Sequence, residues 1–229
     1  VAAEAVDSPF PYSAHMAINI ASDCPPLNPN DKSMEAEFLI DSIAFCASRV
    51  EGGTLALFTS YREMNLVADR IAPAIQGQGR KLYVQGEGLS RTRLVESFAA
   101  DGNAVLFGTD SFWTGVDIPG PALSQVILAR LPFENPSHPV MAARSDHCAA
   151  TGEKPFFALT LPAAQLKFRQ GLGRLIRSRS DRGVLTVLDS RVLHKSYGQA
   201  FLAMLPHPRY RTFTRFNRST HFEGVPAAR

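Results

Sequence analysis

Cysteine is scarce in this sequence, and its placement excludes the sites that cysteine usually builds. The 229 residues contain three cysteines, Cys24, Cys46 and Cys148, which lie far apart and form no CxxC pair. An odd number of widely spaced cysteines provides neither a disulfide framework nor a structural zinc site. We therefore expect each one to be a small buried or half-buried residue rather than a reactive thiol, and we expect a reducing, cytoplasmic setting.

Other familiar signals are also missing. No apolar run reaches membrane-spanning length, and the N-terminal stretch with Glu4 and Asp7 lacks the pattern of a signal peptide. The six histidines form no HxxxH or HExxH pattern, so we expect no metal site. Neither GxxxxGK[ST] nor an acidic Walker-B tetrad is present. A phosphate-binding loop and a Mg²⁺-holding acid would have to come from elsewhere, and because Val1 opens the chain we expect a fragment of a longer protein.

The sequence that is present has the composition of a globular domain. Hydrophobic residues make up 45%, charged residues 20%, and the net charge is +3. Short apolar runs alternate with helical patterns, which predicts a three-layer α/β domain with a mostly parallel sheet. The expected strands are 16–21, 54–59, 81–85, 104–108, 125–129 and 184–189. The expected helices are 34–50, 61–75, 91–100, 138–150, 162–177 and 196–205.

The composition predicts three regions. Residues 1–32 are expected to be an N-terminal linker with one edge strand at 16–21. Residues 33–208 are expected to form the α/β domain. Residues 209–229 form a basic, aromatic tail that we expect to be loosely ordered. Because ligands gather beyond the carboxyl ends of parallel strands, the segments that follow the strands are the candidate sites.

The strongest candidate site is the QGLGRLIR segment at 170–177. On a helix, Gln170, Arg174 and Arg177 fall on one narrow face. An amide that orients water and two guanidiniums suit a triphosphate presented by a neighbouring domain. Gly173 would let another backbone approach closely, at a helix cost of roughly 1 kcal/mol relative to alanine. The alternative is a solvated basic helix face.

The second candidate is the GTDSFWTGVDIPG loop at 108–120, directly after an apolar strand. Asp117 would accept hydrogen bonds from sugar hydroxyls or from an arginine, or it would only cap a turn. Trp113, like its neighbour Phe112, would either stack on a base, at roughly 1–3 kcal/mol, or pack in the core. Thr109 and Ser111 are candidates for contacts with nucleic acid.

Two weaker candidates follow other strands. In the segment from Thr59 through Ser60 to Tyr61, hydroxyls and backbone N–H groups at a helix N-terminus suit a phosphate, although plain N-capping by Ser60 is the alternative. Gln85 and Arg91 lie around the next strand's end and are further candidates for nucleic-acid contacts. Arg91, Arg93 and the tail predict salt-sensitive binding to single strands.

In this order, the segments resemble the C-terminal helicase domain of the DinG/XPD/Rad3 family, superfamily 2 motors, with the bacterial DinG branch most similar. FTSY at 58–61 resembles motif IV, SFWTGVD at 111–117 resembles motif V, and 170–177 resembles motif VI. RLPF at 130–133 resembles the family's KLPF segment.

The resemblance implies a RecA-like (P-loop NTPase-type) fold that lacks its own P-loop. It implies the second motor domain of an ATP-dependent DNA helicase, moving 5′ to 3′. Arg174 and Arg177 would be arginine fingers, and Gln170 would sense the γ-phosphate. The residues that it assigns to ATP binding and coupling are Asp117, Gly115 and Gly173.

The resemblance also implies partners and cofactors. ATP and Mg²⁺ would bind jointly with a first motor domain of the same polypeptide, and a [4Fe–4S] cluster, where the family has one, would lie in that domain. Single-stranded DNA, forked DNA or an R-loop would be the substrate, in the cytoplasm of a bacterium, without a membrane partner.

Two positions depart from the DinG pattern. Position 114 is threonine where that branch usually has glutamate, and Arg130 replaces a usual lysine. Three alternatives therefore stay open: a non-catalytic nucleic-acid-binding or scaffold module, a CRISPR-associated DinG-like helicase, and a nuclease-fused member whose nuclease lies upstream.

Overall fold

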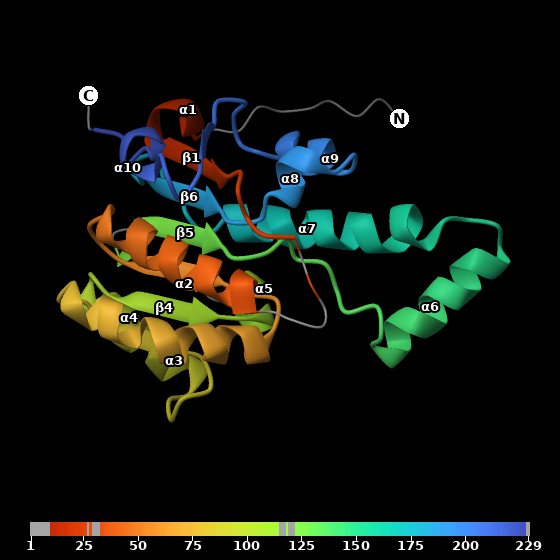
Figure 1. The fold of residues 1–229 in the computed structure, drawn as a ribbon, viewed down its shortest axis with the longest axis horizontal. Coiled ribbons are helices and arrows are strands. Elements are labelled where there is room, and N and C mark those ends of the chain that lie inside the picture. Colours follow the sequence, from red (N-terminus) through yellow and green to blue (C-terminus); the bar gives the residue numbers. More distant parts are fainter. Residues whose placement is uncertain (1–9, 27, 29–32, 115–117, 119–121, 228–229) are drawn as a thin grey trace.

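A parallel sheet runs through the computed structural model, which describes residues 10–26, 28, 33–114, 118 and 122–227 (Figure 1). Seven strands of the described segments pair in the order β3-β4-β2-β5-β6-β1-β7. Every pair is parallel, which confirms the predicted α/β class. The strands are β1 (Met16–Ala21), β2 (Thr54–Leu57), β3 (Leu82–Val84), β4 (Val105–Gly108), β5 (Gln125–Leu128), β6 (Gly183–Val187) and β7 (Arg211–Phe213).

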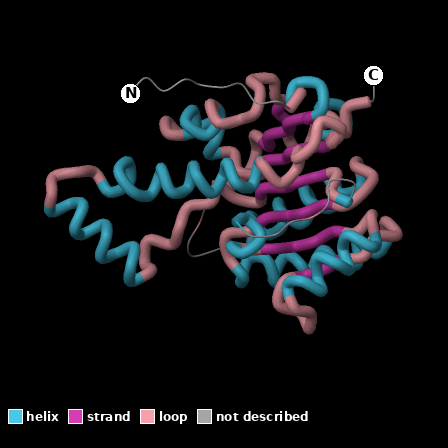
Figure 2. Tube along the Cα trace, turned by 180° about the vertical axis from the view of Figure 1, so that it is seen from behind, coloured by secondary structure: helices cyan, strands magenta, loops and turns pink. Residues whose placement is uncertain are grey.

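Helices cover both faces of the sheet (Figures 1 and 2). Side chains of β2 alternate between two cores, because Leu55 and Leu57 belong to one and Ala56 to the other. Burial on both faces explains why the strands are apolar runs without alternation. The helices are α1 (Tyr12–His15), α2 (Ser33–Ser48), α3 (Tyr61–Gly77), α4 (Arg91–Asp101), α5 (Asp110–Thr114), α6 (Pro139–Ala150), α7 (Leu161–Leu172), α8 (Arg191–His194), α9 (Gly198–Leu202) and α10 (Arg218–His221), with a π-helix, η2, at Phe156–Thr160.

Two sets of helices form the outer layers. Buried residues of α2 and α3 pack with one face of the sheet, and buried residues of α4, α5, α7 and α9 pack with the other. The α6 helix and the first turns of α7 extend beyond the carboxyl ends of the strands, away from the sheet (Figures 1 and 2). None of the described helices is long and apolar enough to cross a bilayer.

The predicted edge position of β1 is wrong. All six residues of β1 are buried, and the strand pairs with β6 on one side and β7 on the other. The partner that covers its outer side comes from the far end of the chain, so the local sequence could not indicate an internal position.

The tail beyond residue 208 is likewise part of the fold rather than loosely ordered. Phe213 and Phe222 are 1% and 9% exposed and pack into the core beside α2. Three arginines of this region form ion pairs with carboxylates, so their charges are already compensated within the chain. This weakens the argument for a salt-sensitive contact between the tail and DNA. The ion pairs are Arg211–Glu223, Arg215–Asp23 and Arg218–Asp41.

Candidate functional site

Three loops at the carboxyl edge of the sheet meet around the side chain of Gln85. Its Oε1 accepts the backbone N–H of Thr109 at 2.7 Å and the hydroxyl of Thr109 at 3.2 Å. Its Nε2 donates to Ser111 Oγ at 3.1 Å and to the Tyr61 hydroxyl. The structure thus brings together four of the predicted nucleic-acid-binding residues, and Gln85 is engaged with the other three.

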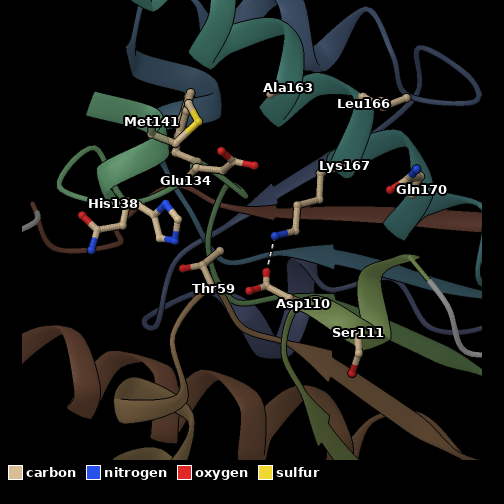
Figure 3. A pocket seen from close by; sticks show the side chains of 12 residues that line it. Thr59, Asp110, Ser111, Glu134, His138, Met141, Ala163, Leu166, Lys167 and Gln170 are labelled. Atoms are coloured by element: carbon tan, nitrogen blue, oxygen red, sulfur yellow. Dashed lines mark hydrogen bonds and ion pairs between the residues drawn. The ribbon is translucent and has the colours of Figure 1, made fainter. Parts of the chain in front are cut away.

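A cavity of about 810 Å³ lies beside these loops (Figure 3). Thr59, after β2, and Asp110 and Ser111, at the start of α5, line one side of it, and α7 faces them with Lys167 and Gln170. Lys167 points toward Asp110 and forms an ion pair with it across the cavity (Figure 3). The remaining lining residues are Phe133, Glu134, Asn135, His138, Met141, Ala163 and Leu166.

A second cavity of about 800 Å³ adjoins the first, because both are lined by Thr59, Phe133, Glu134 and Asn135. Ser60 lines it from the N-terminus of α3, where its Oγ accepts the backbone N–H of Glu63 at 3.4 Å. N-capping, the alternative that the sequence left open for Ser60, is therefore present.

A buried ionic cluster lies behind the start of α3. Arg130 is 4% exposed, and its guanidinium pairs with Glu35 at 3.0 Å and with Glu63 at 3.1 Å. Burial alone would lower the pKa of Arg130, but the charge and hydrogen bond of Glu63, together with the charges of Cys24 and Asp189, outweigh burial and the pKa is raised. The cluster fixes the first turns of α2 and α3 against the end of β5.

The RLPF segment that follows β5 is fixed by Asp189. This carboxylate is 1% exposed, accepts the backbone N–H of Leu131 at 2.8 Å and pairs with Arg191. Burial would raise the pKa of Asp189, but the hydrogen bonds and charge of Arg191 hold it below its ordinary value. Arg191 also lies over the ring of Phe133, 5.5 Å from its centroid.

The predicted helical face of Gln170, Arg174 and Arg177 is wrong. The α7 helix ends at Leu172, and the chain turns from Gly173 onward. Leu172, Leu175 and Ile176 continue a helical apolar spacing and all three are buried, but Leu175 packs against Gly183 at the start of β6. The carboxylate of Asp181 accepts the backbone N–H groups of Arg177 and Ser178, both at 2.8 Å, which stabilises the turn.

Both arginines instead contact the loop that follows β4. Arg174 Nη2 donates to the carbonyl of Trp113 at 2.8 Å, and Arg177 Nη1 donates to the carbonyl of Ile118 at 2.8 Å. Both side chains are half-buried, and burial lowers the pKa of each guanidinium. Gln170 lines the first cavity, whereas the two arginines are not among its described lining residues.

The prediction that Trp113 or Phe112 stacks on a base is wrong in this structure. Both side chains are 0% exposed, and Trp113 Nε1 donates to the carbonyl of Phe58 at 2.9 Å. The core alternative is the observed one. Gly171 makes this packing possible, because a Cβ there would lie 2.9 Å from the Trp113 ring.

The close approach expected at Gly173 occurs at Gly171. A Cβ at Gly173 would meet only carbonyl oxygens of its own helix, at 3.6 Å. Gly115 and Asp117 lie outside the described residues. Arg91 is exposed in the first turn of α4 and takes no part in the hydrogen bonds of Gln85 described above.

The lining of the first cavity includes residues that sequence analysis missed, such as Asp110, Lys167 and His138. Asp110 lies two residues after the end of β4, within the predicted loop at 108–120, and thus had a usable signal. Lys167 and His138 had none, because the α6–α7 excursion that brings them over the strand ends is not visible in the sequence. Among the described residues, no group of three or more His, Cys, Asp and Glu is placed to hold a metal ion.

Comparison with known proteins shows the family of the chain. A family model described as "Helicase C-terminal domain" matches residues 43–208. The chain belongs to the helicase C-terminal domain family. Its resemblance to the DinG/XPD group is confirmed by the relatives, and this helicase C-terminal domain shares its fold with solved XPD structures.

Three relatives illustrate the match. The chain is 36% identical over 205 residues to "3'-5' exonuclease DinG" of Bacillus subtilis (strain 168), covering 88% of this chain and 22% of that protein. It is 35% identical over 223 residues to "ATP-dependent DNA helicase YoaA" of Escherichia coli (strain K12), covering 97% and 34%. It is 39% identical over 201 residues to "ATP-dependent helicase DinG" of Mycobacterium tuberculosis (strain ATCC 25618 / H37Rv), covering 88% and 29%.

Solved structures agree on the fold. "XPD_APO" superposes with a TM-score of 0.70 at 17% identity, covering 88% of this chain and 40% of that one. "XPD_Helicase" superposes with a TM-score of 0.67 at 20% identity, covering 87% and 35%. The helicase C-terminal domain described here spans between about a fifth and a third of the length of its curated relatives (22%, 34% and 29%).

Proposed function

We propose that this chain is the second motor domain of a DinG-type, ATP-dependent DNA helicase. A first motor domain of the same polypeptide would hold ATP and Mg²⁺. Arg174 and Arg177 would then close on the nucleotide, while single-stranded DNA, including the strands of forks and R-loops, runs along the carboxyl edge of the sheet.

One observation supports this proposal above the others. The segment after β4 begins at Thr109 and Ser111, in contact with Gln85, and continues to Trp113 and Ile118, whose carbonyls accept hydrogen bonds from the two arginines. A DNA strand that moves Thr109 and Ser111 would therefore also move the carbonyls of Trp113 and Ile118, and with them the two arginines. This is the physical link that a motor needs between its nucleic acid and its nucleotide.

The chemistry of the arginines suits a transferring phosphoryl group. A guanidinium is planar and always charged, and its N–H groups point in fixed directions, so a carbonyl that orients one edge also orients the rest. Charge that develops on the γ-phosphoryl oxygens would be neutralised by Arg174 and Arg177. Gln170 lies near the end of α7 and lines the first cavity, so it would connect the bound DNA to the site of ATP hydrolysis.

The residues present fit ATP as a shared ligand, but they do not fit a resident metal or cluster. Guanidiniums and an amide match phosphate oxygens, whereas Mg²⁺ prefers carboxylates, and the carboxylate predicted for coupling, Asp117, lies outside the described residues. A [4Fe–4S] cluster needs four thiolates, and this chain has three separated cysteines. The family's cluster and the Mg²⁺ would be held by the first motor domain.

The test is ATP turnover by the full-length polypeptide with single-stranded DNA. We expect Arg174→Ala to lower the stimulated kcat by about 10³-fold or more, the size seen for arginine fingers. Arg179→Ala is the matched control, because Arg179 is an exposed arginine of the same loop. Turnover of Arg174→Ala close to that of the control would refute the finger assignment.

DNA binding, ATP turnover and unwinding by the full-length polypeptide together separate the helicase from the non-catalytic alternative. A non-catalytic or scaffold module would bind single-stranded DNA without hydrolysing ATP. A helicase would do both and would unwind a substrate with a 5′ tail in preference to one with a 3′ tail. The 229-residue chain alone is expected to hydrolyse no ATP.

A further inference from the structure

We propose that Gln85 is a positioning residue that ties the three strand-end loops into one unit, rather than a residue that contacts the nucleic acid. The proposal rests on the proposed function, because it concerns how the loops at the carboxyl edge of the sheet, where the DNA would run, are held in position. It replaces the sequence-based expectation that Gln85 touches DNA.

The contacts of Gln85 occupy both ends of its amide. Oε1 accepts two hydrogen bonds from Thr109, and Nε2 donates to Ser111 and Tyr61. An amide has two acceptor sites and two donor hydrogens, so this set fills its hydrogen-bonding capacity. A phosphate or base edge that took one of them would have to break an existing contact.

The residues tied by Gln85 belong to three separate loops. Tyr61 opens α3 after β2, Thr109 and Ser111 follow β4, and Gln85 itself follows β3. Of the three strands, β3 and β2 are not neighbours in the sheet, since β4 lies between them. The side chain of Gln85 therefore bridges across β4 and connects loops that the backbone pairing does not connect directly.

The backbone holds Gln85 in place for this task. Its N–H donates to the carbonyl of Phe107 at 3.0 Å, which continues the β3–β4 pairing one residue further. The next residue, Gly86, has φ +97°, so the chain turns away immediately and leaves the side chain aimed at β4. Thr109 is 1% exposed, and the amide of Gln85 satisfies its N–H group.

The position of the tied residues explains why the tie matters for DNA. Tyr61 is 51% exposed and Ser111 lines the first cavity, so both are available to a ligand. Without the hydrogen bonds of Gln85, each loop would keep its local conformation, but the positions of the three loops relative to one another would no longer be fixed. Binding the strand would then require the loops to be ordered at that moment, which weakens affinity.

Two substitutions give opposite predictions for positioning and for direct contact. In Gln85→Glu, all four partners can donate to the carboxylate, because the three hydroxyls rotate, so the tie is kept and a negative charge is added. In Gln85→Met, the length and volume are kept and the tie is lost. A positioning role predicts that Gln85→Met is the more damaged variant, and a phosphate contact predicts that Gln85→Glu is.

The measurement is single-strand-stimulated ATP turnover by the full-length protein, at about 0.2 M salt, where the Debye length is below roughly 8 Å and distant repulsion is damped. We expect Gln85→Met to raise the DNA concentration for half-maximal stimulation about five- to tenfold, as for the loss of one or two positioned hydrogen bonds. We expect Gln85→Glu to stay within about twofold of wild type. Gln76→Met, an exposed glutamine at the other end of α3, is the matched control and should leave this concentration unchanged.

A second variant keeps the test informative if Gln85→Met loses thermal stability. Tyr61→Phe removes one of the hydroxyls bonded to Gln85 and keeps the ring, so by itself it should raise the half-maximal DNA concentration. Where Gln85→Met is folded, the effects of the two substitutions should be non-additive. Additive effects, or a larger loss in Gln85→Glu than in Gln85→Met, would overturn the positioning role. Wild-type protein without any DNA-stimulated turnover would instead overturn the proposed function.

Discussion

Replacing Arg130 by methionine should destabilise the fold strongly, because it leaves two carboxylates without their partner. The side chains of Arg130 and Glu35 are 5% and 3% exposed, and that of Glu63 is 14% exposed. Removing one member of a buried ion pair costs about 3–5 kcal/mol, since the remaining charge stays buried and uncompensated. Methionine keeps most of the apolar volume, so the loss reports the charge rather than a cavity.

The assay is the free energy of unfolding of the 229-residue chain in urea. Arg93→Met is the matched control, because the Arg93–Glu96 pair spans 3.8 Å with side chains 77% and 60% exposed, and such pairs contribute at most about 1 kcal/mol. Adding Glu35→Gln to Arg130→Met should recover part of the loss, because a neutral amide costs less to bury. A loss below about 1 kcal/mol for Arg130→Met, with no recovery in the double variant, would contradict the cluster as the support of α2 and α3.

Three further predictions test other parts of the structure. Gly171→Ala should cost about 1–3 kcal/mol in unfolding free energy, because its Cβ would lie 2.9 Å from the Trp113 ring. Gly173→Ala is the control and should be close to neutral, because its Cβ would lie 3.6 Å from the nearest atoms. Equal losses in the two variants would contradict the packing of Trp113 on Gly171. The pKa of Asp189 is lower in the folded than in the unfolded state, so its ionised carboxylate stabilises the fold above about pH 4. This stabilisation is lost as the pH falls through the folded pKa. The urea midpoint of Asp189→Asn should therefore depend less on acid pH than that of the wild type. Burial raises the pKa of Cys46 to about 12, so its thiol should react with an aromatic disulfide reagent only at the rate of unfolding, and fast labelling of Cys46 in the native protein would disprove its burial.

The alternation of strands and helices was predictable from the sequence because it depends on local patterns. The apolar runs at 54–59 and 125–129 match β2 and β5, and Ser60 and Gly102 stand at the helix ends where capping rules place them. The edge assignment of β1 failed because a strand's neighbours are set by contacts distant in sequence.

The candidate site was predictable only in part. The candidate loops were chosen because they follow strands, and Thr59, Tyr61 and Ser111 are accessible at those positions. Trp113 can point inward because Gly171 leaves room for its ring, and the sequence alone does not show which aromatic side chain packs on that glycine. The end of α7 could not be read from apolar spacing, since Leu175 keeps the helical period while packing against the next strand.

The internal position of β1 has a consequence for how the chain reaches its native state. Its outer neighbour β7 is made of residues 211–213, and the side chain of Asn19 in β1 exchanges two hydrogen bonds with the backbone of Glu223, both at 2.9 Å. During synthesis β1 must wait until residues 211–223 have left the ribosome before its hydrogen bonds are complete, which favours slow, late closure of this part of the sheet. A variant truncated at residue 208, where the family match ends, would expose β1 as an apolar edge strand, and such strands promote aggregation.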